Sequence, residues 1–174
     1  MFKIPQVMLD YWTRTAEPKA TAADIATIEV AVGAKLSAPY VEFVTQFGFV
    51  LFTSVRGMRN EFDYALRYPD RMEVRRGNIV AMVDPPWMVN AYERATKIDC
   101  PEDGLPMYPS NYLSVGFTAD QSRVLLELAG DHPGRVWYWP ENDDAWGRGT
   151  NTMLGFVAEN FYDFINRLRP WEEA

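Results

Sequence analysis

Histidine and cysteine are nearly absent from this 174-residue sequence, which contains one of each. A single cysteine, Cys100, excludes a disulfide bond within the chain and a zinc site built on cysteines. The single histidine, His132, lies between Asp131 and Pro133, where we expect an exposed turn residue. A catalytic Ser-His-Asp or Cys-His arrangement would have to use this histidine, and a Gly-x-Ser-x-Gly motif is also missing. We therefore predict no catalytic residues and no metal ligands.

Long apolar runs and phosphate-binding loops are missing too. The most apolar run, residues 47–52, is far shorter than the ~18 apolar residues that span a membrane. Residues 147–152 are close to a Gly-x-Gly-x-x-Gly loop but lack its third glycine, so we interpret them as a loop without a phosphate. The first residues lack the apolar core of a signal peptide. We expect a soluble, cytoplasmic protein with no cofactor and no membrane partner.

The composition is that of a globular protein with a substantial core. Hydrophobic residues make up 48% of the chain, charged residues 24% and aromatic residues 14%. The net charge is −7, and residues 117–174 contain ten acidic residues and five basic ones. An acidic protein is a poor nucleic-acid binder, because phosphate contacts need Lys and Arg, but its field favours a basic partner.

Residues 56–76 reverse this charge balance, with six arginines and four acidic residues. The arginines are interleaved with Phe62, Tyr64 and Tyr68, and aromatic rings among cations are a pattern that binds single-stranded nucleic acid. Because four acids occupy the same window, we interpret the segment as a solvated pair of strands. We predict no nucleic-acid partner.

The spacing of apolar residues predicts two helices at the start of the fold. The first spans 21–33, with an N-terminal capping pattern at Thr21 and Asp24 and a stop at Gly33. The second spans 37–47 and has four side chains on one face: Tyr40, Phe43, Val44 and Phe47. We place no helix before residue 21.

Alternating apolar residues predict strands that occur in two groups. The first group covers residues 62–68, 71–75 and 79–83, and the second covers 113–117, 124–128 and 136–139. Short connections within the second group are typical of an antiparallel meander. Because strands occur in runs, we predict an α+β fold, with an antiparallel sheet flanked by the N-terminal helix pair and a C-terminal helix.

Helices and a loop complete the predicted order. A helix over 84–95 separates the two groups of strands, and residues 140–155 are polar and rich in glycine, which is typical of a long loop. The closing helix carries one apolar stripe: Val157, Phe161, Phe164, Ile165 and Leu168.

Three tryptophans bracket a group of acids in the last third of the chain, which gives six candidate partner-binding residues: Trp137, Trp139, Trp146, Glu141, Asp143 and Asp144. Tryptophan is enriched at binding hot spots, and nearby acids select a basic partner. Alternation places Trp137 and Trp139 on one face of a strand, and core packing of either ring under the last helix stays an open alternative. The acids lack the spacing of a calcium-binding loop.

Four segments also follow one another in a familiar order. The helix pair carries a Gly33-x-x-Leu36 turn followed by Pro39-Tyr40-x-x-Phe43. A proline-rich approach and two strands occupy 106–128, a strand with two tryptophans occupies 134–139, and an apolar helix segment occupies 157–165. In this order the segments resemble the SUKH superfamily, which includes fungal cell-wall-assembly regulators and many bacterial immunity proteins.

The resemblance implies a non-catalytic protein-binding module. It implies that residues 1–174 form a single SUKH-like domain with an insertion or elaboration around 53–105. Because many members neutralise toxins encoded beside them, the expected function is an immunity protein that binds a cognate toxin. A nuclease toxin with a basic face would suit this acidic chain. Two alternatives remain: an adaptor for another cytoplasmic protein, and a small metal-dependent hydrolase that uses Glu141, Asp143 and Asp144. The oligomeric state is left unpredicted.

Overall fold

The computed structural model describes residues 1–52, 57–98 and 104–170, so Arg56 and Cys100 lie outside the described ranges. No helix in these ranges combines the length and the apolar character needed to cross a membrane. The elements are α1 (Gln6–Thr15), α2 (Ala22–Val32), α3 (Ala38–Gln46), β1 (Arg59–Arg67), β2 (Met72–Asn78), β3 (Ala81–Met82), α4 (Pro85–Glu93), the π-helical turn η1 (Arg94–Ile98), β4 (Tyr112–Phe117), β5 (Arg123–Glu127), β6 (Val136–Trp139), β7 (Gly155–Ala158), α5 (Phe161–Arg167) and β8 (Arg169–Pro170).

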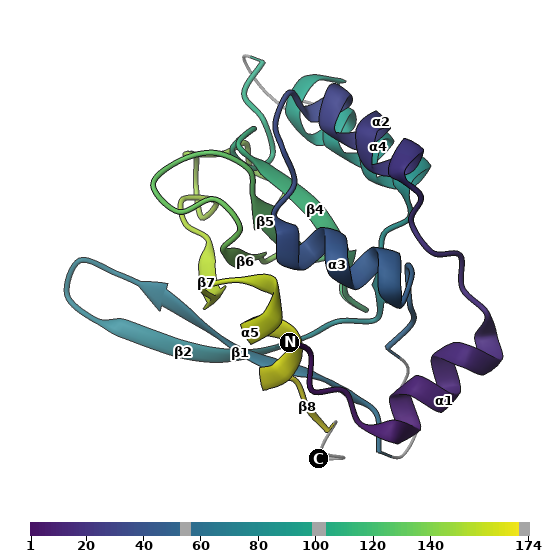
Figure 1. The fold of residues 1–174 in the computed structure, drawn as a ribbon. Coiled ribbons are helices and arrows are strands. Elements are labelled where there is room, and N and C mark those ends of the chain that lie inside the picture. The colour runs from purple at the N-terminus through teal and green to yellow at the C-terminus, as the bar shows by residue number, and fades with distance from the viewer. Residues whose placement is uncertain (53–56, 99–103, 171–174) are drawn as a thin grey trace.

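The strands form one antiparallel sheet in the order β2-β1-β7-β6-β5-β4-β3, and β8 pairs with β1. Strands β4, β5 and β6 pair in chain order, which confirms the predicted meander, and β3 and β7 extend it on either side. The β1–β2 hairpin joins the far side of this meander, because β1 pairs with β7 at Ala65 and Phe156. Figure 1 shows that the hairpin extends away from the helices. The fold is α+β, as predicted.

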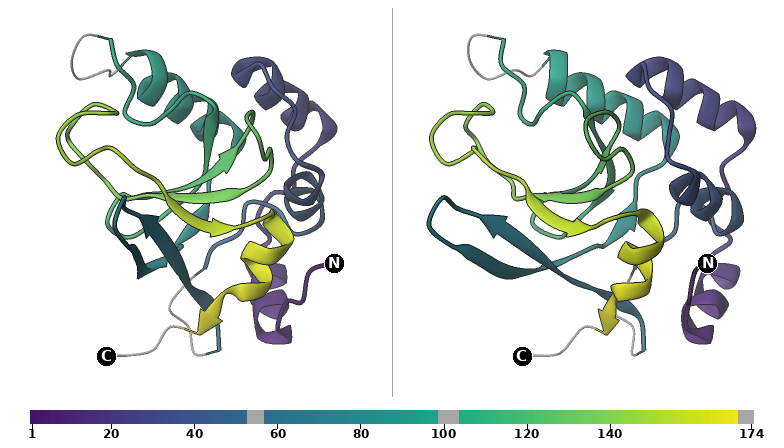
Figure 2. Two further views of the ribbon diagram at one scale, coloured as in Figure 1. Left: turned by 90° about the vertical axis from the view of Figure 1, so that its left-hand side faces the viewer. Right: turned by 60° about the vertical axis from the view of Figure 1, so that its left-hand side comes forward.

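Helices α1, α3 and α5 cover one face of the sheet (Figure 2). Between α3 and α5 the core is aromatic: the Tyr40 and Phe161 rings meet edge to face at 5.2 Å, and Phe43 and Phe161 at 5.3 Å. These rings come from the apolar faces that the sequence pattern predicted for both helices. Helices α2 and α4 lie side by side (Figure 1) at one end of this core.

Helix α1 differs from the prediction, which places no helix before residue 21. Its Trp12 is buried, meets the edges of Phe43 and Phe52 at 5.9 and 5.6 Å, and donates its indole N–H to the Leu51 carbonyl at 2.8 Å. Pro5 at its N-terminus makes no side-chain capping bond. A helix this short is marginal alone, so packing of Met8 and Trp12 stabilises it rather than a local signal.

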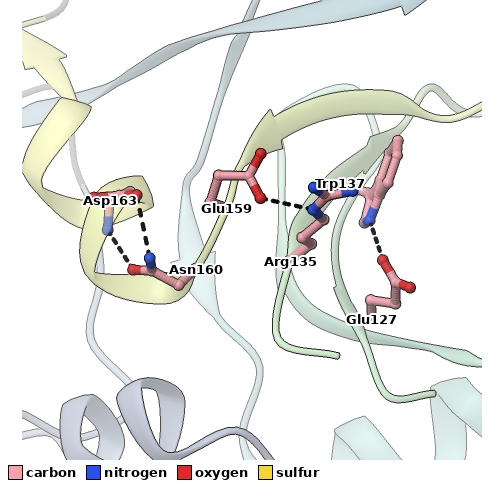
Figure 3. A network of polar contacts seen from close by, with 6 residues as sticks. All are labelled: Glu127, Arg135, Trp137, Glu159, Asn160 and Asp163. Atoms are coloured by element: carbon pink, nitrogen blue, oxygen red, sulfur yellow. Dashed lines mark hydrogen bonds and ion pairs between the residues drawn. The ribbon is translucent and has the colours of Figure 1, made fainter. Parts of the chain in front are cut away.

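The closing helix also begins later than predicted. Val157 belongs to β7, and α5 begins at Phe161, after Asn160 accepts a hydrogen bond from the backbone N–H of Asp163 at 3.0 Å. Figure 3 includes this cap. The prediction of helix at Val157 is therefore wrong, although Phe161, Phe164, Ile165 and Leu168 are buried as expected.

Gly155 of β7 gives space to an aromatic pair on the core face. The rings of Tyr64 and Tyr138 lie 4.4 Å apart, and a Cβ atom at Gly155 would stand 2.3 Å from Cδ2 of Tyr64. Tyr64 comes from the segment around 53–105, whose described parts supply β1, β2, β3, α4 and η1. That this segment is an insertion stays a prediction.

Candidate functional site

The sheet face opposite α3 and α5 carries a second apolar cluster. Its buried members are Tyr108, Leu125 and Trp139, and the long loop after β6 packs over them. The edge of the Tyr108 ring meets Trp139 at 5.6 Å. Burial raises the pKa of Tyr108 well above its ordinary value, so this phenol stays neutral. The predicted long loop therefore packs against the sheet through apolar side chains.

Trp139 and Trp137 share this face, as alternation predicted, but neither lies under the last helix. Trp139 is 6% exposed and donates its indole N–H to Oδ1 of Asn151 at 3.0 Å. Trp137 is half-buried and donates to Oε2 of Glu127 at 2.9 Å (Figure 3). Its ring lies 5.5 Å from that of Phe156. Both indoles have partners within the chain.

Trp146 and Asp144 hold the loop in shape. Trp146 is half-buried against the second cluster, and its backbone N–H donates to the Pro106 carbonyl at 2.7 Å. Asp144 is exposed, and its Oδ2 accepts from the backbone N–H of Thr150 at 3.1 Å. The contacts of these two residues are therefore made within the loop and its neighbours.

Glu141 and Asp143 differ from the other four candidates, because they are exposed and line a hollow of ≈440 Å³ beside α4. The rest of its wall includes Asn90 of α4 and Arg94 of η1, together with Tyr108 and Trp139. The structure thus brings two of the predicted acids to a concave surface, with Trp139 as part of its floor.

A larger hollow of ≈620 Å³ adjoins the first one, and the two share Trp87, Ala91, Gln121 and Arg123. We call the two hollows together the α4 groove. Its larger end is apolar, with Leu51, Ala81, Met82 and Phe117 in the wall. Trp87 is 69% exposed and Phe117 is 39% exposed, so both rings are available for contact.

Local sequence chemistry positions Trp87 at the groove. Asp84 caps α4 by accepting from the backbone N–H of Trp87 at 3.0 Å, and Pro85 and Pro86 fit the first helical turn. Met88 and Tyr92 face the core and are buried, which leaves Trp87 and Ala91 on the groove side. Trp87 and Phe117 are therefore exposed aromatic residues of the groove that sequence reasoning did not single out.

The groove floor contains an unsatisfied polar atom. Ser114 is 1% exposed, and its hydroxyl has no hydrogen-bond partner among the described residues. It lies where the pairing of β4 with β5 shifts register, between Ser114 and Gly116. Buried hydroxyls normally have a partner, so this one is an exception within the sheet, beneath the groove surface.

The turn between β4 and β5 forms the wall opposite α4. Gln121 has a left-handed backbone with φ 66°, and Arg123 donates to the carbonyl of Ser122 at 3.2 Å. Burial raises the pKa of Asp120, but hydrogen bonds from Thr118 and Ser122 lower it by more, so the carboxylate is favoured. These bonds fix the turn that presents Gln121 and Arg123.

The charge of the groove is mainly negative. Four carboxylates line it, those of Glu17, Asp84, Glu141 and Asp143, against the guanidinium groups of Arg94 and Arg123. Within the described ranges, no three His, Cys, Asp or Glu side chains meet as ligands for a metal ion. His132 is exposed, as predicted. The groove thus combines an apolar end with an excess of negative charge, a combination that suits a surface with both apolar and basic side chains.

Comparison with protein families gives a match to the model of the SMI1/KNR4 family (SUKH-1) over residues 19–167. A comparison with curated proteins gave no match, and neither did a comparison with solved structures. The match begins before α2 and ends with α5, so it covers the second and third helices and the whole meander. The chain therefore belongs to the SMI1/KNR4 family (SUKH-1), a membership that supports a protein-binding role at the level of the family.

Proposed function

We propose that this protein is an immunity protein that neutralises a cognate bacterial toxin by binding it through the α4 groove. Family membership supports a protein-binding role, and toxin immunity is one role of such families. The observation that carries the choice of surface is the exposed Trp87, which lines the same hollow as Glu141 and Asp143. We further propose that the chain acts by binding rather than by catalysis.

The groove offers two kinds of contact to a toxin. Trp87 and Phe117 provide apolar area at the larger end, where a partner side chain would be desolvated. Glu141 and Asp143 provide negative charge at the smaller end, where Lys or Arg of the partner would lie. Nucleases bind phosphates with basic faces, so a nuclease toxin has the chemistry that fits. Occupying that face would block access of nucleic acid.

The first experiment is to purify the tagged protein from its native host and identify what stays bound by mass spectrometry. The captured protein is then expressed in a sensitive host, with and without this chain. We expect a basic toxin domain that stops growth alone and is harmless when the chain is present. A bound housekeeping regulator without toxicity would favour the adaptor alternative instead.

A matched pair of variants then tests the surface. Trp87→Ala removes the exposed ring of the groove, and Val30→Ala removes an 83% exposed apolar side chain from α2. We expect Trp87→Ala to weaken toxin binding by about thirtyfold, since a hot-spot residue contributes about 2 kcal/mol or more. Val30→Ala should bind as the wild type does. Equal binding by both variants would place the toxin elsewhere on the chain.

A further inference from the structure

The two edge strands of the sheet, β3 and β2, differ in whether another segment pairs with their outer side. At one end, β3 is covered by residues 50–52: Phe52 donates its backbone N–H to Val80 at 2.7 Å, and Met82 donates to Val50 at 2.9 Å. At the other end, β2 pairs with β1 alone among the strands that the structure describes. Figures 1 and 2 show this hairpin projecting from the body, with β2 on its outer side.

The hydrogen bonds at the two ends of the hairpin fix which backbone groups point outward. Ile79 donates to the Asn60 carbonyl at 2.8 Å, and Tyr68 donates to the Arg71 carbonyl at 2.8 Å. Hydrogen-bonded pairs alternate along an antiparallel ladder, and the register between these bonds is continuous. The backbone N–H and C=O groups of odd-numbered β2 residues therefore point toward β1. Those of Met72, Val74 and Arg76 point away from it.

The side chains of β2 alternate in charge and polarity. Glu73 and Arg75 share one face and form an ion pair at 2.7 Å. Met72 and Val74 lie on the opposite face and are 65% and 59% exposed, so this face of the strand offers apolar area to a partner. Arg76 lies within 3.3 Å of Glu61 of β1. The outer strand thus combines outward backbone groups, exposed apolar area and both signs of charge.

We propose that β2 is the interface for a second copy of this chain, which adds its own β2 antiparallel to form one continuous sheet. This inference goes beyond the proposed function and does not depend on it. A twofold axis normal to the sheet keeps each side chain on its own face. Directly opposite residues also share a face, so each residue of β2 must lie opposite a residue an even number of positions away. The axis therefore lies beside one residue of β2, which is paired with its own copy. An axis at Glu73 or Arg75 would oppose two like charges, which is destabilising.

An axis at Val74 keeps the two faces of the sheet, opposes no like charges and pairs the outward backbone groups. Glu73 then lies opposite Arg75 of the second copy, and Arg75 lies opposite its Glu73. Val74 faces Val74, and Met72 faces the alkyl part of Arg76, which has Glu61 beside its charge. The outward groups at Met72, Val74 and Arg76 pair in about six backbone hydrogen bonds. Charges on an edge strand usually prevent pairing, whereas in this register they complement one another.

The oligomeric state of the full chain tests the proposal, by sedimentation velocity over a wide range of protein concentration. We expect a dimer of the wild type. Val74→Pro removes an outward N–H and no bond of the β1–β2 ladder, so it should keep the fold and raise the dimer dissociation constant at least about tenfold. Val74→Thr keeps the N–H and should dimerise. Circular dichroism and thermal unfolding confirm that each variant is folded.

A charge exchange tests the register itself. Glu73→Arg and Arg75→Glu should each be monomeric, because each opposes like charges in the joint sheet. An equimolar mixture of the two should dimerise again, and so should the double variant in one chain. A wild type that stays monomeric overturns the proposal. A dimer that survives Val74→Pro and both charge variants overturns it as well, because the interface then lies on another surface.

Discussion

Trp139 and Asn151 are joined across the long loop by a hydrogen bond of 3.0 Å from the indole N–H to the amide oxygen. Asn151 is 3% exposed, and its amide also donates to the carbonyls of Met107 at 2.6 Å and Asp144 at 2.9 Å. One side chain therefore links β6, the proline-rich segment and the loop. Because the loop carries Glu141 and Asp143, this link holds the acidic end of the α4 groove in place.

Asn151→Ala should destabilise the protein by about 3 kcal/mol, because it leaves a buried indole N–H and two carbonyls without partners. The measurement is urea unfolding followed by tryptophan fluorescence. Asn142→Ala is the matched control, since Asn142 also makes two bonds in the loop, but exposed ones: it donates to Thr150 at 2.9 Å and accepts from the backbone N–H of Asp144 at 3.0 Å. It should cost less than about 1 kcal/mol. Equal losses for the two variants would mean that Asn151 does not hold the loop.

Gly155→Ala should cost about 2–3 kcal/mol, because its Cβ atom would stand 2.3 Å from the Tyr64 ring. The control is Gly147→Ala, where φ is +82° and no atom lies within 4 Å, so only the backbone cost of a left-handed alanine, about 1–2 kcal/mol, applies. A double-mutant cycle with Tyr64→Leu tests the cause. If the Tyr64 ring is the obstacle, the cost of Gly155→Ala falls in that background.

Asp120 should make stability depend on pH in the acid range. The folded state lowers its pKa below the ordinary 3.8, so the unfolded state takes up the proton at higher pH. The stability that Asp120 contributes is present above about pH 4 and is lost as pH falls through the folded pKa. Asp120→Asn should remove this component. Unfolding by urea at a series of pH values measures it, with Asp131→Asn as an exposed control from the next turn.

Glu141 and Asp143 should speed association with the toxin. The double variant Glu141→Gln/Asp143→Asn is expected to lower the association rate several-fold at low salt, and the difference should shrink as salt screens the charges. Stopped-flow binding to the captured toxin domain measures this rate. Asp10→Asn/Asp131→Asn has the same net charge but changes exposed acids outside the groove. If both double variants slow binding equally, net charge alone steers the encounter.

Elements with local signals were predicted well. The capping box of Thr21 and Asp24 and the left-handed Gly33 bound α2 as expected, and Asp84 with two prolines begins α4. The α5 boundary was predicted wrongly because Val157 stands four residues before Phe161, a spacing that fits one helical face. Val157 lies instead in β7, which pairs with β1 and β6. The Asn160 cap was a local signal that could have corrected the boundary.

The candidate site was predicted only in part, because it is assembled from distant segments. Alternation correctly placed Trp137 and Trp139 on one face, but the sequence pattern does not say which loop covers that face. Trp87 comes from α4 and Phe117 from the end of β4, and only the fold brings them to one groove. A partner-binding role for the six predicted residues stays a prediction, and exposure within the groove favours it for Glu141 and Asp143.

The position of β1 between β2 and β7 has a consequence for how the chain folds. The β1–β2 hairpin and the β3–β7 meander are each built from neighbouring segments, so each can form early. The two halves are joined through β1, which meets β7 at Phe156 and β8 at Arg169 and Pro170. Pairing β1 with β7 and β8 brings together residues about a hundred positions apart in the chain. On the ribosome, the hairpin must therefore wait for the last part of the chain before the sheet is complete.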